Sequence, residues 1–501
     1  MKRAIYIGID LGTTVLKAAV YDGASGRRLA TCSRRLPLQS GSDGRREQNP
    51  AAVLRALGGV MRGLRSEMGE KRWKSVGGLG LAAQGGSTII CERESGRAVT
   101  PMFLWNDYRC FPWFARIAEM HPASYWRSFS LRDEPGVGLG RISWLRELEP
   151  RLFGPGRIHV GAGELVYRHM TGAWRQDACN ALQTGCYDGR RGRLIEQPLS
   201  IVGLTLDAVA PLRRGHETHP LRDSVARQWG LEPGLPVAGP YNDHEAGYLS
   251  ASHVSKSPLQ CSLGTAWVGN FVTRPGTEGH QPIQLVVPAP IGDGRLTIQP
   301  LLTGNVTWDW ALETWIDHDH KTALSRQGRV FGEQLLPPPG LMALPWLNRP
   351  NPLMENASGG AVLFGIGPAT AKDDFVRAIA AGMCHEFARM FLPLREAGIV
   401  DALVLGGGAS KGNQFRRQIA ALFDPLPIHQ FTEQDESGTR GCLYAFSRQA
   451  ARAGVRRVPV DRSLDRAAIG KAHKLYLDLY DRLYGHVAAG RPYAIRTRRS
   501  R

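Results

Sequence analysis

The sequence of 501 residues contains no uncharged apolar run of about eighteen residues, the length that a helix needs to span a bilayer. Met1 to Arg3 lead straight into a predicted strand, without the apolar core of a signal peptide. Low-complexity segments and long linkers are also missing. We therefore expect a soluble, cytoplasmic globular chain that is not exported and has no membrane partner.

Metal-binding patterns are absent as well. The eight cysteines form no Cys-x-x-Cys pair, and no histidine cluster has zinc spacing. Reduced and mostly buried thiols in a cytoplasm explain such scattered cysteines best. They are Cys32, Cys91, Cys110, Cys179, Cys186, Cys261, Cys384 and Cys442.

Acidic residues are too few to balance the basic ones, and 63 Lys and Arg against 45 Asp and Glu give a net charge of +18. A basic surface attracts phosphates, so nucleic acid has to be considered as a partner. The arginines are dispersed, however, and no aromatic residues are interleaved with them. The only dense basic run is 496–501, for which a frayed, solvated end is favoured over a binding role. We do not expect a nucleic-acid partner.

The first motif is the stretch Ile5 to Thr14, followed by a second β-rich run from Val15 to Asp22. Alternating apolar residues on both sides of a turn predict a strand, a tight turn and a strand. The amides and hydroxyls of Gly12, Thr13 and Thr14 can converge on anionic oxygens, such as the terminal phosphates of a nucleotide. A bare hairpin turn is the alternative interpretation.

Asp10 lies at the tip of this predicted hairpin. A carboxylate beside phosphate oxygens is not attracted to them, and its presence makes sense chiefly as a Mg²⁺ ligand, often through water.

Polar residues follow two further predicted strands. Gln84 ends the buried strand Val76 to Ala82, and ligand sites of α/β sheets gather at strand ends. The segment Trp105 to Arg109 combines an aromatic wall with amide, carboxylate and guanidinium groups, a mixture that suits a polyhydroxylated ligand. An ordinary loop glutamine remains the alternative for Gln84.

Asp243 follows the short buried strand Gly234 to Gly239, in a segment that looks like a loop entering a helix of small residues. This aspartate lies where the first half of the chain ends. A helix N-cap before Ala246 is the alternative interpretation of its role.

The opening pattern restarts near Leu259, because Cys261 to Val268 is again a strand, a glycine-threonine turn and a strand. Since the length also exceeds one core, we infer a duplicated fold whose two hairpins face each other across a cleft. The expected domains are residues 1–251 and 252–485, followed by a basic tail over 486–501.

Other segments predict elements through local signals. Asn49 and Pro50 open a helix, Ser87 to Cys91 pairs back on the preceding strand, and Thr439 to Ala453 forms a closing helix. Gly304 precedes a helix whose three tryptophans are interpreted as core. They are Trp308, Trp310 and Trp315.

A glycine-rich loop follows the predicted strand Ile399 to Leu405, and a helix begins near Asn413 and runs to Phe423. Glycines at Gly406, Gly407 and Gly408 would let the backbone approach a flat base or a phosphate. Such loops are weak evidence alone. After two phosphate-type hairpins, nucleotide binding is the better explanation.

Taken together and in this order, these motifs resemble the FGGY family of carbohydrate kinases, in particular its xylulokinase-like members, over about residues 4 to 485. The resemblance implies an α/β fold with two actin-like (ribonuclease H-like) ATPase domains. It also implies ATP and Mg²⁺ as cofactors and a small-molecule sugar or polyol as substrate. A homodimer, common in the family, is left open.

The resemblance assigns roles residue by residue. Asp243 matches the catalytic base, Asp10 the metal ligand, and Lys17 a basic residue near the transferred phosphate. The implied nucleotide site comprises Gly12, Thr13, Thr14, Lys17, Gly264, Thr265, Gly304, Gly407, Gly408 and Asn413. The implied substrate site comprises Gln84, Gly85, Trp105, Asp107 and Asp243.

Several residues depart from the family pattern. Gly85 and Gly86 stand where xylulokinase-type members have Met-His-Gly after the glutamine, which removes two side chains from the sugar pocket and leaves the sugar's identity open. Arg141 stands in place of a usual lysine. Asn242 to Glu245 replaces the commoner Gly-Asp-Asn, and Asn348-Arg349 replaces Glu-Arg.

We therefore expect an ATP-dependent kinase of a ketose such as xylulose, or of a related polyol, with Asp243 as base. Kinases of the gluconate, glycerol, rhamnulose or fuculose type are alternatives within the family. A non-catalytic sugar- or nucleotide-sensing protein on the same fold and an actin-like or chaperone-like ATPase are the alternatives outside catalysis of sugar phosphorylation.

Overall fold

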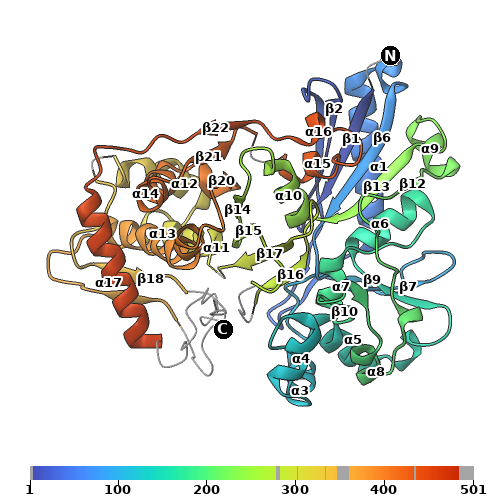
Figure 1. The fold of residues 1–501 in the computed structure, drawn as a ribbon, viewed down its shortest axis with the longest axis horizontal. Helices are drawn as coiled ribbons and strands as arrows, with labels where there is room; N and C mark the ends of the chain where they lie inside the picture. Colours follow the sequence, from blue (N-terminus) through green and yellow to red (C-terminus); the bar gives the residue numbers. More distant parts are fainter. Residues whose placement is uncertain are drawn as a thin grey trace, which may run out of the picture. The chain divides into compact units, whose positions relative to one another are not determined.

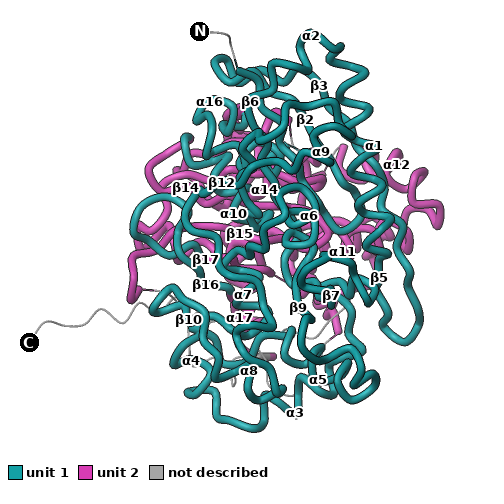
Figure 2. Tube along the Cα trace, turned by 90° about the vertical axis from the view of Figure 1, so that its right-hand side faces the viewer, with its two compact units in different colours: residues 1–253, 285–296, 436–453 teal, residues 254–284, 297–435, 454–501 magenta. Residues whose placement is uncertain are grey.

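The computed structural model describes residues 4–277, 283–301, 303–332, 334–346, 360–433 and 436–484. The predicted basic tail and Asn348-Arg349 lie outside these residues. The chain forms two compact units (Figure 2). The first comprises Met1–His253, Leu285–Leu296 and Glu436–Ala453, and the second comprises Val254–Gln284, Thr297–Asp435 and Gly454–Arg501. Two short segments thus return to the first unit after the chain has entered the second.

The first unit is built on a six-stranded mixed sheet (Figure 1). Strand β1 pairs antiparallel with β2 and parallel with β6, which in turn pairs parallel with β13. The edge strands β3 and β12 are antiparallel to their neighbours. In spatial order the strands are β12 (Thr218–Pro220), β13 (Pro236–Asn242), β6 (Val76–Ala83), β1 (Ile5–Leu11), β2 (Val15–Asp22) and β3 (Arg28–Arg35).

One face of this sheet packs on helix α1 (Pro50–Met68), because alternate residues of β1 point to the same side. Ile5, Ile7, Ile9 and Leu11 share a buried cluster with the apolar side chains of α1. The predicted cap is confirmed, since the Asn49 side chain accepts hydrogen bonds from the Ala51 and Ala52 amides and Pro50 opens the helix. The helices α6 (Ala162–Thr171) and α9 (Asp223–Trp229) add to the same core.

The other face packs on α10 (Asp243–Ala251) and on the returning segment with α15 (Ser437–Gly441), drawn in red beside the blue strands in Figure 1. The backbones approach closely at glycines. A Cβ atom on Gly8 would lie 1.7 Å from the Thr439 carbonyl oxygen, and one on Gly80 would lie 2.3 Å from that of Cys442. No residue with a side chain fits at either position.

The remaining elements of the first unit are short. They are α2 (Glu70–Trp73), α3 (Phe111–Glu119), α4 (Ala123–Ser130), α5 (Val137–Leu148), α7 (Ala178–Thr184), α8 (Gln197–Ile201), α16 (Arg448–Ala451), β4 (Gln39–Ser40), β5 (Arg46–Gln48), β7 (Ile89–Glu92), β8 (Met102–Phe103), β9 (Arg157–Val160), β10 (Tyr187–Asp188) and β11 (Arg193–Leu194).

A seven-stranded sheet repeats the pairing of the first one. Strand β14 pairs antiparallel with β15 and parallel with β20, as β1 does with β2 and β6, and β20 pairs parallel with β21. Both hairpins turn at Leu-Gly-Thr, Leu11 to Thr13 and Leu263 to Thr265. The predicted duplication and α/β class are therefore confirmed. In spatial order the strands are β16 (Leu285–Pro288), β17 (Arg295–Pro300), β15 (Trp267–Thr273), β14 (Pro258–Leu263), β20 (Ala402–Gly406), β21 (Ile428–Phe431) and β22 (Val455–Arg457).

Helix α13 (Lys372–Glu396) is the central helix of the second unit, and most of its residues are buried. The predicted helix over Asn413 to Phe423 is confirmed with those bounds as α14. Helix α11 (Asn305–Trp315) carries the three tryptophans, but only Trp308 is fully buried, and Trp310 is 38% exposed. The other described elements are α12 (His320–Val330), α17 (Arg466–Tyr484), β18 (Met342–Leu344) and β19 (Val362–Phe364).

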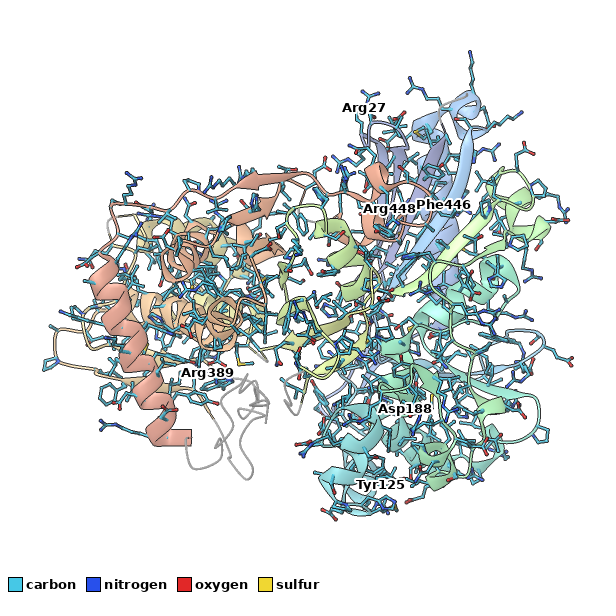
Figure 3. All side chains as sticks on the ribbon, in the orientation of Figure 1. Arg27, Tyr125, Asp188, Arg389, Phe446 and Arg448 are labelled. Carbon is cyan, nitrogen blue, oxygen red and sulfur yellow. The ribbon has the colours of Figure 1, made fainter. Side chains whose placement is uncertain are left out.

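Two local predictions are wrong. Strand β7 does not pair back on β6, because its partner is β9, which lies far along the chain. The segment Thr439 to Ala453 is not one helix but contains the C-terminal end of α15 and the whole of α16. Between them Phe446, labelled in Figure 3, stacks on Tyr6 with ring centroids 5.4 Å apart. Ser447 caps α16 by accepting a hydrogen bond from the Ala450 amide.

All eight cysteines are unpaired and seven of them are buried, as predicted. In the part of the chain that the structure describes, no helix combines the length and the apolar character needed to cross a bilayer.

The close packing of α15 on the sheet predicts a strong asymmetry between two glycine-to-alanine substitutions in the first unit. Gly80→Ala places a methyl group against the backbone of Cys442 and should lower the free energy of unfolding by about 3 kcal/mol. Gly59→Ala, in the middle of α1 with nothing nearer than 3.8 Å, should raise it by about 0.5–1 kcal/mol. Urea unfolding followed by circular dichroism measures both. Equal stability of the Gly80 variant and the wild type would contradict the packing described.

Candidate active site

Three parallel strands of the first unit end side by side, and each carries a predicted site residue at or just beyond its carboxyl end. Leu11 of β1 pairs with Ala83 of β6, and Ala83 pairs with Asn242 of β13. Gln84 and Asp243 therefore follow neighbouring strands, beside the turn that follows Asp10. Ligand sites of open α/β sheets form at this edge.

The turn after β1 is fixed by side chains from three other segments. The Thr13 hydroxyl donates to Gln84 Oε1 at 2.9 Å and accepts a hydrogen bond from Trp105 Nε1 at 3.2 Å. The Thr13 carbonyl accepts one from Gln48 Nε2 at 2.6 Å. Thr14 is exposed. The structure thus brings Thr13, Gln84 and Trp105 into one hydrogen-bonded group.

Asp10 lies opposite Lys17 in the register of the hairpin. Its carboxylate lies against the backbone of α15, because a Cβ on Gly438 would be 2.3 Å from Asp10 Oδ2. The predicted metal ligand is therefore held between its own hairpin and a segment more than four hundred residues later in the chain.

Asp243 is the first residue of α10 and is half-buried. The helix is capped by Asn242, whose side chain accepts a hydrogen bond from the His244 amide at 3.0 Å, so Asp243 is not the N-cap. The same first turn is anchored by a buried ion pair in which Arg213 donates to both oxygens of Glu245, at 2.7 and 2.9 Å. These contacts fix the start of the helix that carries Asp243.

The glycines after Gln84 do not open the space that their sequence suggests. A Cβ on Gly85 would lie 2.6 Å from Asn242 Nδ2, and one on Gly86 would lie 2.2 Å from Gln183 Oε1. Gly86 also has φ +71°, which L residues with side chains rarely adopt. The room expected from the two missing side chains is therefore taken up by Asn242 and Gln183.

Trp105 and Asp107 differ in their surroundings although both belong to the predicted sugar pocket. Trp105 is 36% exposed, whereas Asp107 is 1% exposed. Both Asp107 oxygens accept hydrogen bonds from the Arg109 guanidinium, at 2.6 and 3.0 Å, and Oδ2 also accepts one from the Arg46 amide at 3.0 Å. The carboxylate thus fixes the loop, and the indole is the group that faces solvent.

In the second unit, three glycine segments meet at the turn after β14. The Gly264 carbonyl accepts a hydrogen bond from the Asn305 amide at 3.0 Å. A Cβ on Gly304 would lie 2.4 Å from the Thr265 carbonyl oxygen, and one on Gly407 would lie 2.6 Å from the Leu263 carbonyl carbon. Gly407 also has φ +84°, so a glycine is needed there both for the close contact and for the positive φ.

Two other predicted nucleotide residues lie beside these glycines. Gly408 is close to the Asn305 side chain, since a Cβ there would lie 3.4 Å from Asn305 Nδ2. Asn413 is the first residue of α14, and its side-chain oxygen accepts a hydrogen bond from Arg416. The structure therefore groups the predicted nucleotide residues of this unit around one turn and one helix start.

Comparisons with known proteins identify the family of the chain. Residues 5–250 match the FGGY family of carbohydrate kinases, N-terminal domain. The xylulose kinase of Bacillus subtilis (strain 168) is 24% identical over 494 residues, 96% of each chain. The chain belongs to the FGGY family of carbohydrate kinases. It is accordingly a phosphotransferase that acts on a hydroxyl of a small-molecule sugar, and the family implies ATP as the phosphoryl donor.

Solved structures share the fold of this FGGY kinase. The xylulose kinase from Rhodospirillum rubrum superposes with a TM-score of 0.83 at 18% identity and covers 96% of this chain and 99% of its own. The gluconate kinase from Lactobacillus acidophilus gives 0.82 at 19% identity, with 97% and 99% covered.

Sequence reasoning missed the role of Arg141 in this FGGY kinase. Its guanidinium is fully buried and donates to the carbonyl oxygens of Gly86, Leu104 at 2.7 Å and Trp105 at 2.9 Å. Burial lowers the pKa of Arg141. One arginine thus joins the two loops that carry Gln84 and Trp105. Its position in the family motif was visible in the sequence, but its three carbonyl partners were not.

Gln183 was missed altogether, because nothing marks a helical glutamine as unusual. Its side-chain oxygen is buried without a hydrogen-bond partner among the described residues, and so is Gln84 Nε2. A buried acceptor and a buried donor therefore lie unused beside Gly86 and Thr13. Such groups carry a desolvation cost that a ligand hydroxyl can remove.

A buried carboxyl supports the same loop. Glu164 accepts a hydrogen bond from Asn180 Nδ2 at 2.7 Å, and Asn180 Oδ1 accepts one from the Gly86 amide at 3.2 Å. Burial, followed by the nearby charge of Asp177, raises the pKa of Glu164 well above the usual carboxyl range. The neutral form of Glu164 is thus the one that this site favours.

The carbonyl contacts of Arg141 predict that its side chain stabilises the fold. Arg141→Met removes the donor from the carbonyl groups of Gly86 and Trp105, while the Leu104 carbonyl keeps the Asp107 amide, and it should lower the free energy of unfolding by about 3 kcal/mol. Arg141→Lys, with one ammonium in place of the fork, should recover part of this loss. Urea unfolding measures both variants. A Met variant as stable as the wild type would contradict the linking role.

The raised pKa of Glu164 predicts a pH dependence of stability. Because the folded state holds this proton more tightly than the unfolded state, the contribution is complete below the unfolded pKa near 4.5 and falls as pH rises toward the folded pKa. Glu164→Gln should remove a slope of up to about 1.4 kcal/mol per pH unit above pH 5. Unfolding between pH 5 and 8 measures this slope. The exposed Glu67→Gln serves as control and should keep the wild-type slope.

Proposed function

We propose that the chain transfers the γ-phosphoryl group of ATP to a hydroxyl of a ketose such as xylulose, or of a related polyol. The observation that carries the proposal is the position of Asp243, at the carboxyl end of β13 beside Gln84 and the hairpin turn. The name of the Bacillus subtilis relative supports a ketose as the substrate. A gluconate-type acceptor is the second candidate, because the gluconate kinase from Lactobacillus acidophilus matches the fold with a TM-score of 0.82, against 0.83 for the xylulose kinase from Rhodospirillum rubrum.

Asp243 would act as the base. A carboxylate is much more acidic than a sugar hydroxyl, so it would orient that hydroxyl and take up its proton late, once bonding to phosphorus has begun. The half-buried carboxylate at the anchored start of α10 suits this role, since its position is fixed while one side remains open.

Gln84 and Gln183 would bind the substrate hydroxyls. The unused Gln84 Nε2 can donate to a ligand oxygen, and the unused Gln183 Oε1 can accept from a ligand hydroxyl. The exposed indole of Trp105 would supply the apolar wall against which a carbon chain lies. We assign Asp107 a supporting role, because its oxygens are already occupied by Arg109 and Arg46.

The glycine-threonine turns would hold the nucleotide. In the first unit Gly12, Thr13, Thr14 and Lys17 would contact phosphate oxygens. In the second unit the turn at Gly264 and Thr265 would do the same, while Gly304, Gly407, Gly408 and Asn413 would line the adenosine.

Asp10 would bind Mg²⁺. The described residues contain no group of three or more His, Cys, Asp or Glu side chains that could cage a metal ion. A single carboxylate fits Mg²⁺, which keeps several waters and takes its other ligands from phosphate oxygens. When bound, the ion would neutralise charge on the β- and γ-phosphates.

The deciding experiment measures ADP production with Mg²⁺ and ATP across ketopentoses, ketohexoses, deoxyketoses, polyols and aldonates. One strong acceptor should appear, and Asp243→Asn should lower its kcat at least about 100-fold while ATP affinity stays within a few-fold. Asp223→Asn is the matched control, because Asp223 is the first residue of α9 and is exposed. It should leave kcat unchanged.

Three results would count against the proposal. A near-normal rate for Asp243→Asn would remove Asp243 as the base. Bound ATP with no turnover on any acceptor would favour a protein that senses sugar or nucleotide without catalysis. An acceptor-independent ATPase would favour the actin-like or chaperone-like class.

A further inference from the structure

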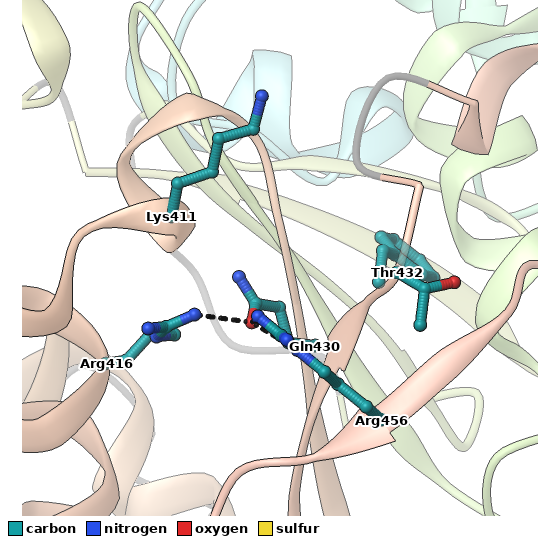
Figure 4. Close-up of a pocket in the computed structure, with 6 residues that line it drawn as sticks. Lys411, Arg416, Gln430, Thr432 and Arg456 are labelled. Carbon is teal, nitrogen blue, oxygen red and sulfur yellow. Dashed lines mark hydrogen bonds between the residues drawn. The ribbon is translucent and has the colours of Figure 1, made fainter.

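The second unit contains a pocket that none of the assigned site residues lines. Its volume is about 290 Å³. It is formed by the short helix η3 (Gly408–Lys411), by α14, by the end of β21 and by β22 (Figure 4). The lining residues are Lys411, Arg416, Gln430, Phe431, Thr432 and Arg456. Three of the six are cationic and none is acidic.

A buried glutamine fixes two of these cations. Gln430 is 1% exposed, and its Nε2 donates to the Ser410 carbonyl at 2.6 Å, which sets the orientation of the amide. Its Oε1 accepts hydrogen bonds from Arg416 at 2.8 Å and from Arg456 at 2.9 and 3.1 Å. Arginines from a helix and from a strand are therefore aimed at one neutral oxygen, as the dashed line at Arg416 shows in Figure 4.

This arrangement concentrates uncompensated positive charge. Burial and the neighbouring charge of Arg456 lower the pKa of Arg416. No carboxylate of the described residues forms an ion pair with Arg416, Arg456 or Lys411. A neutral amide oxygen cannot neutralise two guanidinium groups, so the pair repels itself in the absence of an anion.

Three arginines with buried side chains elsewhere in the chain have carboxylate partners, whereas the buried Arg141 donates to backbone carbonyl oxygens instead. Arg213 pairs with Glu245 at 2.7 Å, Arg389 pairs with Glu386 at 2.7 Å, and Arg440 pairs with Glu436 at 3.1 Å (Arg389 is labelled in Figure 3). In the pocket, Arg416 is half-buried and Arg456 is exposed. The fold thus orients the guanidinium groups of Arg416 and Arg456, but no carboxylate of the described residues pairs with them.

We propose that this pocket binds the phosphate group or groups of a small molecule. Each guanidinium carries five N–H donors, and Gln430 and Asn413 engage only some of them. Forked donors match phosphate oxygens in pairs, while the Lys411 ammonium adds a point charge and the Thr432 hydroxyl adds a donor. The volume admits one or two phosphate groups with a small organic part, and it is too small for a folded partner.

The test uses the full chain and inorganic pyrophosphate as the probe, titrated by calorimetry at low chloride concentration without sugar or ATP. Arg416→Gln and Arg456→Gln should each weaken binding at least tenfold. Lys411→Gln should weaken it about three- to tenfold, and this exposed side chain can be changed without disturbing the fold. Arg329→Gln, an exposed arginine in the same unit, removes the same charge and should leave the affinity unchanged.

A further variant separates charge from geometry. Arg456→Lys keeps the charge but loses the fork and should restore part of the affinity lost in Arg456→Gln. Pyrophosphate binding that is absent, or that is equal in the wild type and the three pocket variants, would overturn the proposal. The proposal would also be overturned if these variants bound a single-stranded DNA decamer more weakly than the wild type but bound pyrophosphate equally well, because the cations would then serve a nucleic acid. Neither outcome depends on turnover of a sugar.

Discussion

The backbone contact between α15 and the first sheet is the constraint on which the proposed chemistry depends. Gly8 and Gly80 leave no space between the sheet and the carbonyl groups of Thr439 and Cys442. Across the same segment, a Cβ on Gly441 would lie 1.8 Å from the Ala246 carbonyl oxygen of α10. The hairpin that carries Asp10 and the helix that begins with Asp243 are thus both packed against one short segment. Any shift of α15 would therefore change the positions of both carboxylates.

The polar residues Arg141 and Glu164, which support the loop at Gly86, are both buried. The Arg141 guanidinium donates to carbonyl oxygens and forms no ion pair with a carboxylate of the described residues, and Glu164 is favoured in its neutral form. Arg141 donates to the Gly86 carbonyl directly, and Glu164 acts on the Gly86 amide through Asn180. A loop fixed from two sides loses little entropy when a ligand binds, which is how a site keeps reacting groups in position.

The predictions that the structure confirms rest on local signals in the sequence. The hairpins at Gly12 and Gly264, the cap at Asn49 and the bounds of α14 follow from residues adjacent in the chain, and the structure has all of them. The failures involve distant partners. No local pattern predicts contacts between segments that are distant in the sequence. Examples are the pairing of β7 with β9, the packing of α15 and the contact of Gly86 with Gln183. The N-cap of α10 is Asn242 and not Asp243, a shift of one residue that sequence does not decide because both residue types cap helices equally well.

The crowding at Gly86 has an evolutionary consequence. Restoring a histidine there would require a backbone outside the φ +71° region and the removal of the Gln183 side chain, which would lie 2.2 Å away from the new Cβ. A histidine at position 86 alone would therefore give a less stable protein, and its cost depends on the side chain at position 183. Exchange between this pocket and the family's Met-His-Gly form is therefore epistatic. Lineages with the double glycine are expected to have kept it together with the glutamine across substrate changes.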